Sequence, residues 1–206
     1  MDILIIGGAG MLGQKLAQSV QRQGGLGGKP VGKITLADMV MAAKPAGPAA
    51  VEVVVVDLAQ AGALIAARPD VIFHLAAVVS GEAEADFDKG YAVNLDGSRN
   101  LFEAIRAQGR DYCPRVVFAS STAVFGAPFP DEIGDEFCVT PASSYGTQKA
   151  ITELLLNDYS RRGIFDGVGL RLPTICIRPG TPNRAASGFF SNILREPLVG
   201  LPAVLP

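Results

Sequence analysis

The chain has 206 residues, of which 49% are hydrophobic, and its 18 basic and 20 acidic side chains give a formal net charge of −2. This length fits one large domain with an ample core, and the near-neutral charge argues against a nucleic-acid-binding face. Cysteines at 113, 138 and 176 have no CxxC spacing, and His74 is the only histidine, which argues against a disulfide framework, a metal site and a Ser-His-Asp triad.

Short β-branched runs alternate with helical patterns, which predicts an α/β fold with a doubly wound parallel sheet. Strands are expected at residues 3–6, 33–37, 51–56, 71–75, 115–119 and 167–172, and helices at 11–23, 88–108 and 145–161. Two stretches rich in Gly, Pro and Ala, 24–32 and 42–50, are interpreted as surface excursions. No apolar run is long enough to cross a bilayer and no signal peptide is evident, so we expect a soluble, cytoplasmic protein.

A glycine motif, Gly7, Gly10 and Gly13, lies between the first predicted strand and the first predicted helix. The first glycine permits a tight turn, the second lets the backbone approach a pyrophosphate, and the third allows close packing of helix on strand. The helix amino terminus at Met11 and Leu12 would then face the phosphates of a dinucleotide. The spacing is G-x-x-G-x-x-G rather than G-x-G-x-x-G, and the alternative is a glycine-rich turn without a ligand.

Asp38 ends the second predicted strand and is followed by no basic residue in 39–41. A carboxylate there can accept hydrogen bonds from the adenosine ribose and would repel a 2′-phosphate, which favours NAD over NADP. Asp57 could approach the adenine amino group, and a helix-capping role is its alternative. His74 is interpreted as a structural histidine rather than a catalytic base.

Tyr145 and Lys149 are four residues apart at the start of the predicted helix 145–161, so their side chains share one helical face. A tyrosine titrates at about 10, and a nearby ammonium is expected to lower that pKa and make Tyr145 a usable base. Ser121, at a strand end, could position the reacting oxygen, with Ser120 as its rival. Together with the glycine motif, these residues suggest a nicotinamide-dependent oxidoreductase.

These motifs resemble the extended short-chain dehydrogenase/reductase family, also called the NAD-dependent epimerase/dehydratase family. The resemblance implies a Rossmann domain over residues 1–178, a bound NAD, and Ser121, Tyr145 and Lys149 as the catalytic trio. Asn94 would connect its helix to Lys149 through a water, unless it is a plain helix asparagine. The implied cofactor contacts are Gly7, Gly10, Met11, Leu12, Gly13, Asp38, Asp57, Leu58, Leu75, Ala76, Ala77, Asn94, Tyr145, Lys149 and Thr174.

Two departures from the family pattern bear on the substrate. Thr174 stands where many sugar-nucleotide members carry an asparagine, and Thr122 follows Ser121 where dehydratases carry an acidic pair. The segment 171–198 instead resembles members that oxidise the 2-hydroxyl of a small sugar acid with NAD. The carboxylate of such a substrate would need an arginine, for which Arg178 and Arg184 are the candidates. The alternative for each is an arginine that is merely exposed to solvent. The implied substrate contacts are Ser121, Thr122, Tyr145, Thr174 and Arg178.

In members of this family, most of the substrate pocket is formed by residues that follow the position corresponding to residue 206. Residues 179–206 are therefore expected to be the start of an incomplete substrate region. The expected partner is a small sugar acid, with no nucleic acid, membrane or metal, and members often pair as homodimers through helices like those at 94–108 and 145–161. A nucleotide-sugar epimerase that keeps its NAD bound and a non-catalytic NAD-binding sensor are the alternatives.

Overall fold

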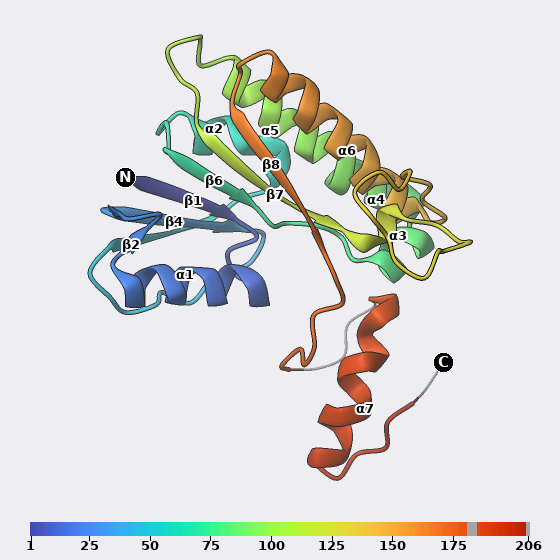
Figure 1. The fold of residues 1–206 in the computed structure, drawn as a ribbon. Helices are drawn as coiled ribbons and strands as arrows, with labels where there is room; N and C mark the ends of the chain where they lie inside the picture. The colour runs from blue at the N-terminus through green and yellow to red at the C-terminus, as the bar shows by residue number, and fades with distance from the viewer. Residues whose placement is uncertain (181–184, 205–206) are drawn as a thin grey trace.

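A six-stranded parallel sheet forms the centre of the computed structural model, which describes residues 1–180 and 185–204 (Figure 1). The strand order is β5-β4-β1-β6-β7-β8. The strands are β1 (Asp2–Ile6), β4 (Lys33–Asp38), β5 (Ala50–Val55), β6 (Val71–His74), β7 (Arg115–Ser121) and β8 (Asp166–Leu172). The chain runs outward from β1 to β5 and then returns to place β6 beside β1, so ligands are expected at the carboxyl ends of β1 and β6. The predicted doubly wound sheet is confirmed.

Helices cover both faces of this sheet. On one face lies α1 (Met11–Gln23), and on the other lie α2 (Ala61–Ile65), α5 (Gly97–Arg106) and α6 (Ser144–Arg161) (Figure 1). Strand β1 serves both cores because successive side chains point to opposite faces. Ile3 and Ile5 join the buried cluster that includes Ala17 of α1, whereas Leu4 joins the cluster that includes Leu101 of α5.

The predicted helix at 88–108 is helical up to Arg106 but changes its geometry along the way. It consists of α4 (Phe87–Gly90), a π-helical segment (Tyr91–Asp96) and α5. Short π-helical segments occur often at functional sites. Here the segment contains Asn94, which is 2% exposed and makes hydrogen bonds to the chain after β6.

Several short elements were not expected from the sequence. The stretch 24–32 contains a hairpin of β2 (Gly25–Leu26) and β3 (Lys29–Pro30), and α3 (Ser80–Ala85) follows β6. Helix α7 (Phe189–Leu198) stands apart from the sheet, below the end of β8 (Figure 1). The hairpin and the helices α2 and α3 are too short to show a reliable hydrophobic period in the sequence. Helix α7 is also short, and it contains Pro197, which is not expected inside a helix.

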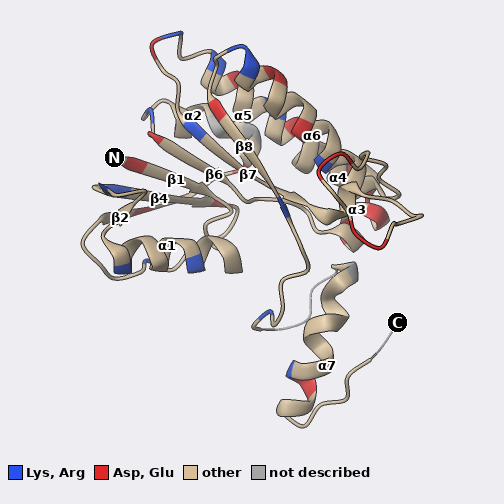
Figure 2. Cartoon of the chain, in the orientation of Figure 1, with Lys and Arg blue, Asp and Glu red and all other residues tan. Residues whose placement is uncertain are grey.

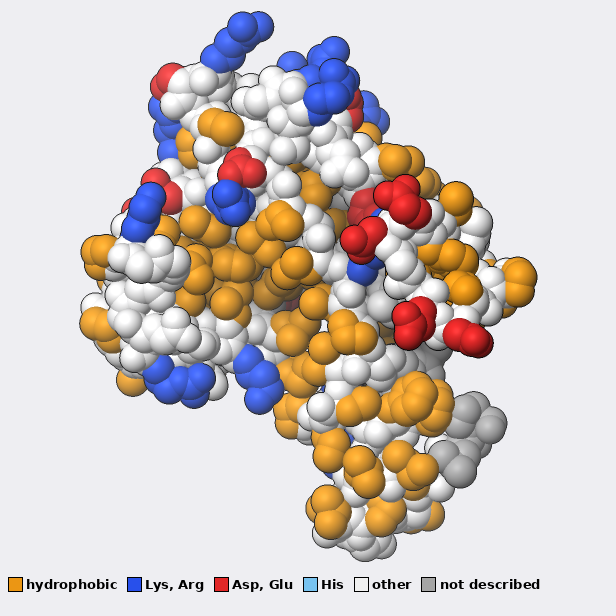
Figure 3. Space-filling model, in the orientation of Figure 1, with side chains coloured by type: hydrophobic (Ala, Val, Ile, Leu, Met, Phe, Trp, Pro, Cys, Tyr) orange, Lys and Arg blue, Asp and Glu red, His pale blue; other side chains and the backbone are white. Residues whose placement is uncertain are grey.

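Hydrophobic side chains gather over α7 and also across the middle of the molecule in the view of Figure 3. Leu198 on α7 is 82% exposed, and Leu170 on the edge strand β8 is 47% exposed. Acidic side chains gather on the loop that precedes α6, beside α3, as Figure 2 shows. None of the helices in the described ranges is long and apolar enough to cross a membrane.

Candidate active site

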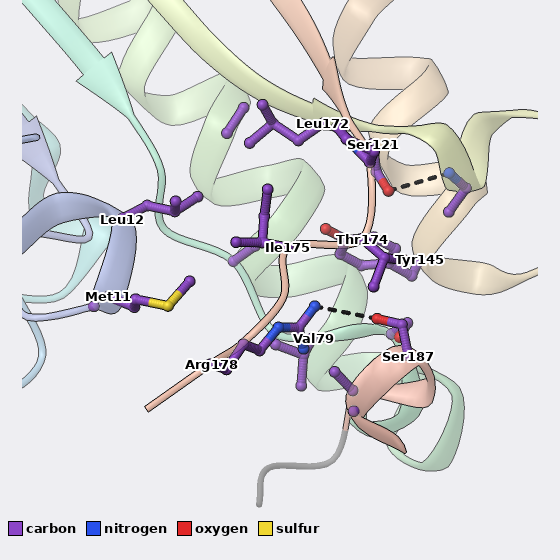
Figure 4. Close-up of a pocket in the computed structure, with 18 of the residues that line it drawn as sticks. Met11, Leu12, Val79, Ser121, Tyr145, Leu172, Thr174, Ile175, Arg178 and Ser187 are labelled. Atoms are coloured by element: carbon purple, nitrogen blue, oxygen red, sulfur yellow. Dashed lines mark hydrogen bonds between the residues drawn. The ribbon is translucent and has the colours of Figure 1, made fainter. Parts of the chain in front are cut away.

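A cleft of about 730 Å³ opens at the carboxyl ends of the central strands. It lies between the glycine loop, the ends of β7 and β8, the first turn of α6, and α7. Thirteen of the predicted site residues line it, namely Gly7, Gly10, Met11, Leu12, Gly13, Leu75, Ala77, Ser121, Thr122, Tyr145, Lys149, Thr174 and Arg178. The structure therefore brings the predicted cofactor residues and the predicted catalytic trio together, and Figure 4 shows part of this lining.

The glycine loop needs glycine for space as well as for backbone conformation. Gly7 has φ +89°, and a Cβ there would lie 2.7 Å from the backbone nitrogen of Ala76. A Cβ on Gly13 would lie 2.3 Å from the carbonyl oxygen of Gly7. Gly10 precedes α1 and brings no side chain to cap it, so the first amides of the helix face the cleft. This arrangement suits a pyrophosphate.

Asp38 lies against the same loop. Its Oδ2 accepts a hydrogen bond of 2.9 Å from the amide of Ala9, and its Oδ1 accepts one of 2.8 Å from the amide of Met39. Both bonds orient the carboxylate at the end of β4. The contact of Asp38 with a ribose stays a prediction.

Five predicted cofactor residues are absent from the cleft lining in the described chain: Asp38, Asp57, Leu58, Ala76 and Asn94. Leu58 is buried in the core beneath α5, and Ala76 packs against Gly7. Asn94 accepts a hydrogen bond from the amide of Val78 and donates to the carbonyl of Val78 and to Gln148. Both N–H donors of its side-chain amide are thus used within the protein, and Asn94 clamps the segment after β6 to the π-helical segment.

The start of α6 is fixed by hydrogen bonds on both sides of Tyr145. Ser143 caps the helix, because its Oγ accepts a 3.1 Å bond from the amide of Gly146. The Ser144 amide donates a 2.9 Å bond to Glu84 of α3. Glu84 also lines the cleft and was not expected from the sequence, because the short helix that carries it gives no recognisable pattern.

Ser121, rather than Ser120, faces the tyrosine. The Ser121 Oγ accepts a 3.1 Å bond from the Ala123 amide, which Figure 4 draws as a dashed line, and a hydrogen bond with Tyr145 lowers the pKa of the phenol. Ser120 is 3% exposed, and its hydroxyl donates to the carboxylate of Glu153 on α6. The alternation of side chains along β7 therefore turns the Ser121 hydroxyl toward Tyr145 and the Ser120 hydroxyl toward Glu153, although both serines line the cleft.

Lys149 is buried at 2% exposure, and its Nζ donates a 2.8 Å hydrogen bond to the carbonyl of Ala119. The same nitrogen lies 4.7 Å from the ring centre of Phe118 and 5.6 Å from that of Tyr145. Burial lowers the pKa of Lys149 to about 7. At neutral pH only part of the population carries the ammonium charge.

Burial also raises the pKa of Tyr145 above its ordinary value, against the lowering effects of the hydrogen bond with Ser121 and the positive charge of Arg178. The sequence-based expectation that Lys149 makes this pKa low is therefore wrong for the protein without ligands. Desolvation outweighs the charges, and the Lys149 ammonium is itself weakened by burial.

His74 belongs to the interior and not to the cleft. Its Nε2 lies 2.8 Å from the Ser98 hydroxyl, and the residue is 1% exposed. Burial, together with the charge of Lys149, lowers the pKa of His74 to about 3, so the ring is neutral at physiological pH. This environment agrees with the interpretation of His74 as structural. In the described chain, no group of acidic, histidine and cysteine side chains has a metal-binding arrangement.

We predict that Lys149→Met has a larger free energy of unfolding than the unchanged chain, and that this difference is larger at low pH than at high pH. The unfolded lysine titrates at 10.5 and the folded one at about 7, so between these values the unfolded state binds more protons. The unfolding free energy of the unchanged chain should rise by about 1.4 kcal/mol per pH unit from this group. The advantage of the variant is therefore largest at pH 7 and below and shrinks toward pH 10.5.

Urea unfolding at several pH values measures this difference. Lys15→Met, an exposed position on α1, is the matched control and should show no such trend. A stability difference for Lys149→Met that does not change with pH contradicts the prediction.

The far side of the cleft comes from the chain after β8. Thr174 and Arg178 line it, as do Ser187, Ser191 and Arg195 from the segment that includes α7. The last three were not expected, because an isolated serine or arginine in sequence carries no sign of a cleft. The alternative candidate Arg184 lies outside the described residues.

Comparison with known proteins gives close relatives. The sequence profile described as the NAD dependent epimerase/dehydratase family matches residues 3–205. D-erythronate dehydrogenases from Cupriavidus necator and Haemophilus influenzae are 52% and 46% identical over 100% of this chain, which covers 65% of each. The chain thus spans somewhat less than two thirds of the length of these curated relatives.

Solved structures agree with this fold. The crystal structure of a nucleoside-diphosphate-sugar epimerase from Agrobacterium tumefaciens is 67% identical, with a TM-score of 0.93 over 100% of this chain and 62% of that one. A UDP-glucose 4-epimerase from Thermus thermophilus, in complex with NAD, is 25% identical with a TM-score of 0.80, over 98% of this chain and 64% of that one.

Proposed function

Because the chain belongs to the NAD dependent epimerase/dehydratase family, we propose that its cleft binds NAD and oxidises the 2-hydroxyl of a small sugar acid, D-erythronate, to a 2-keto acid. The observation that carries the proposal is the convergence of Ser121, Tyr145 and Lys149 with the glycine loop on one cleft. The two relatives named as D-erythronate dehydrogenases support the choice of substrate.

The glycine loop fits a dinucleotide. The space that a Cβ would fill at Gly7 and Gly13 is already occupied by backbone, so these residues cannot carry side chains and the loop stays open toward the cleft. Amides at the start of α1 would bind the pyrophosphate, and Asp38 would accept hydrogen bonds from the adenosine ribose. Its negative charge disfavours a 2′-phosphate, which supports NAD over NADP.

When bound, NAD supplies the acceptor for the hydride that leaves C2 of the substrate. The Ser121 hydroxyl would position the reacting hydroxyl, and Tyr145, as the phenolate, would take its proton. Lys149 would bind the nicotinamide ribose and, in its charged form, favour that phenolate. Because burial alone raises the pKa of Tyr145, the reaction depends on positive charge near the phenol. One proton and one hydride leave the alcohol, which balances its oxidation to a ketone.

We infer the domain boundary from the same arrangement. Residues 1–178 would hold the cofactor and the catalytic trio, and residues 179–206 would begin the substrate region. The support is that Ser187 and Arg195, which lie beyond the sheet, line the cleft opposite the glycine loop.

A nucleotide-sugar epimerase is the second candidate. It is favoured by the 67% identity to the Agrobacterium tumefaciens protein that carries this name. The same trio would then oxidise and re-reduce a sugar ring without net formation of NADH.

One experiment separates the two candidates. The chain is incubated with NAD and D-erythronate, with NADP and D-erythronate, or with NAD and UDP-glucose, and NADH or NADPH absorbance and sugar products are recorded. The proposal predicts NADH only in the first mixture. Conversion of UDP-glucose without net reduction, and no NADH from D-erythronate, would replace it with the epimerase.

A further inference from the structure

We propose that Arg178 binds the substrate carboxylate beside Tyr145 and that the α7 segment, residues 187–198, positions Arg178 for this task. The cleft would then select acids whose reacting hydroxyl lies on the carbon next to the carboxylate. This inference rests on the proposed oxidation and adds the group that chooses which hydroxyl reacts.

Among the basic side chains of the cleft, Arg178 is the one whose charge is best placed to bind an anion. In the described chain, the basic side chains that line the cleft are Lys149, Arg178 and Arg195. Lys149 is committed to the Ala119 carbonyl, and the Arg195 guanidinium pairs with Glu196 at 2.5 Å. No acidic side chain among the described residues lies within ion-pair distance of Arg178. Its charge therefore remains available for an anion.

Three hydrogen bonds fix Arg178 from the α7 side. Its amide donates a 3.0 Å bond to the hydroxyl of Ser191, which is 1% exposed, and its carbonyl accepts a 2.6 Å bond from Arg195. Its Nη2 donates a 3.1 Å bond to the Ser187 hydroxyl, which Figure 4 shows as a dashed line. A guanidinium that is already ordered loses less conformational entropy when it binds a carboxylate. Ser187 and Arg195 are thus positioning residues.

The place of Arg178 sets which hydroxyl can react. Its charge is near enough to Tyr145 to act on the ionisation of the phenol, and both residues lie around the same hollow in Figure 4. One of its five side-chain N–H groups donates to Ser187. The others suffice for two parallel hydrogen bonds to the oxygens of a carboxylate. A carboxylate held there leaves the adjacent carbon beside Tyr145 and Ser121.

Calorimetry tests this with two ligands of nearly identical shape, D-erythronate and its neutral amide, D-erythronamide. The unchanged chain should bind the acid roughly 10- to 100-fold more tightly than the amide, as expected for a hydrogen-bonded charge pair. Arg178→Gln should remove this preference, and Arg178→Lys should restore only part of it because an ammonium has no paired geometry. Ser187→Ala should reduce the preference a few-fold without weakening binding of the amide.

Arg162→Gln is the matched control, because Arg162 is exposed at the end of α6 and lies outside the cleft lining. It should keep the preference for the acid. An unchanged chain with no preference for the acid, including one that binds neither ligand, overturns the inference, and so does a preference that survives in Arg178→Gln. Failure of the proposed function is a separate result, since it would show as tight binding of the acid without formation of NADH.

Discussion

Tyr145→Phe is expected to lower turnover of D-erythronate by roughly 10²- to 10⁴-fold, because the variant loses the group that accepts the hydroxyl proton. The ring remains, so its packing beside Lys149, whose Nζ lies 5.6 Å from the ring centre, should persist. Affinity for NAD should therefore change little. Steady-state NADH formation and calorimetric binding of NAD measure the two quantities separately.

Tyr91→Phe is the control for this substitution. Tyr91 packs against Phe87 with ring centres 4.5 Å apart and lies outside the cleft lining. Its variant should keep normal turnover. Near-normal turnover by Tyr145→Phe would rule out the mechanism even if NAD still binds.

Gly13→Ala is expected to destabilise the chain by about 1–3 kcal/mol and to weaken NAD binding at least roughly 10-fold. The added Cβ would lie 2.3 Å from the Gly7 carbonyl oxygen and 2.9 Å from the Gly8 Cα. Both contacts are with backbone, so no side chain can move to relieve them. The start of α1 must then shift away from the loop that would bind the pyrophosphate.

Gly62→Ala provides the same substitution in an open place. Gly62 lies in the short helix α2, and nothing stands within 4 Å of the Cβ it would gain. Its variant should be as stable as the unchanged chain or slightly more stable, because alanine favours helix. Denaturant unfolding and NAD titration of both variants test the prediction, and equal behaviour of the two would contradict it.

The sheet and its loop could be predicted because each depends on a local pattern. An apolar run such as Ile3–Ile6 is typical of a strand buried on both faces, as in a parallel sheet, and a strand, glycine motif and helix in that order are typical of a dinucleotide-binding unit. Alternation along β7 could also have separated Ser120 from Ser121, since neighbouring residues face opposite sides. The four-residue spacing of Tyr145 and Lys149 likewise predicts that both lie on one face of a helix, here α6.

Other parts of the site depend on contacts between distant residues. The pKa of Tyr145 is set by how much protein surrounds the phenol, which the spacing to Lys149 does not contain. The clamp of Asn94 on Val78 depends on a π-helical segment that has no recognised sequence signal. The anchoring of Arg178 by Ser187 depends on where α7 docks. Each of these needs three-dimensional packing before it can be seen.

The most direct test of the central claim follows the hydrogen on C2 of the substrate. D-erythronate carrying deuterium at C2 is incubated with NAD and the chain, and the NADH and the 2-keto acid are analysed by mass spectrometry. Direct transfer beside Tyr145 predicts that each NADH carries one deuterium and that one 2-keto acid forms with it. Formation of NADH without the label, or no NADH while the chain binds both NAD and the acid, would contradict the account.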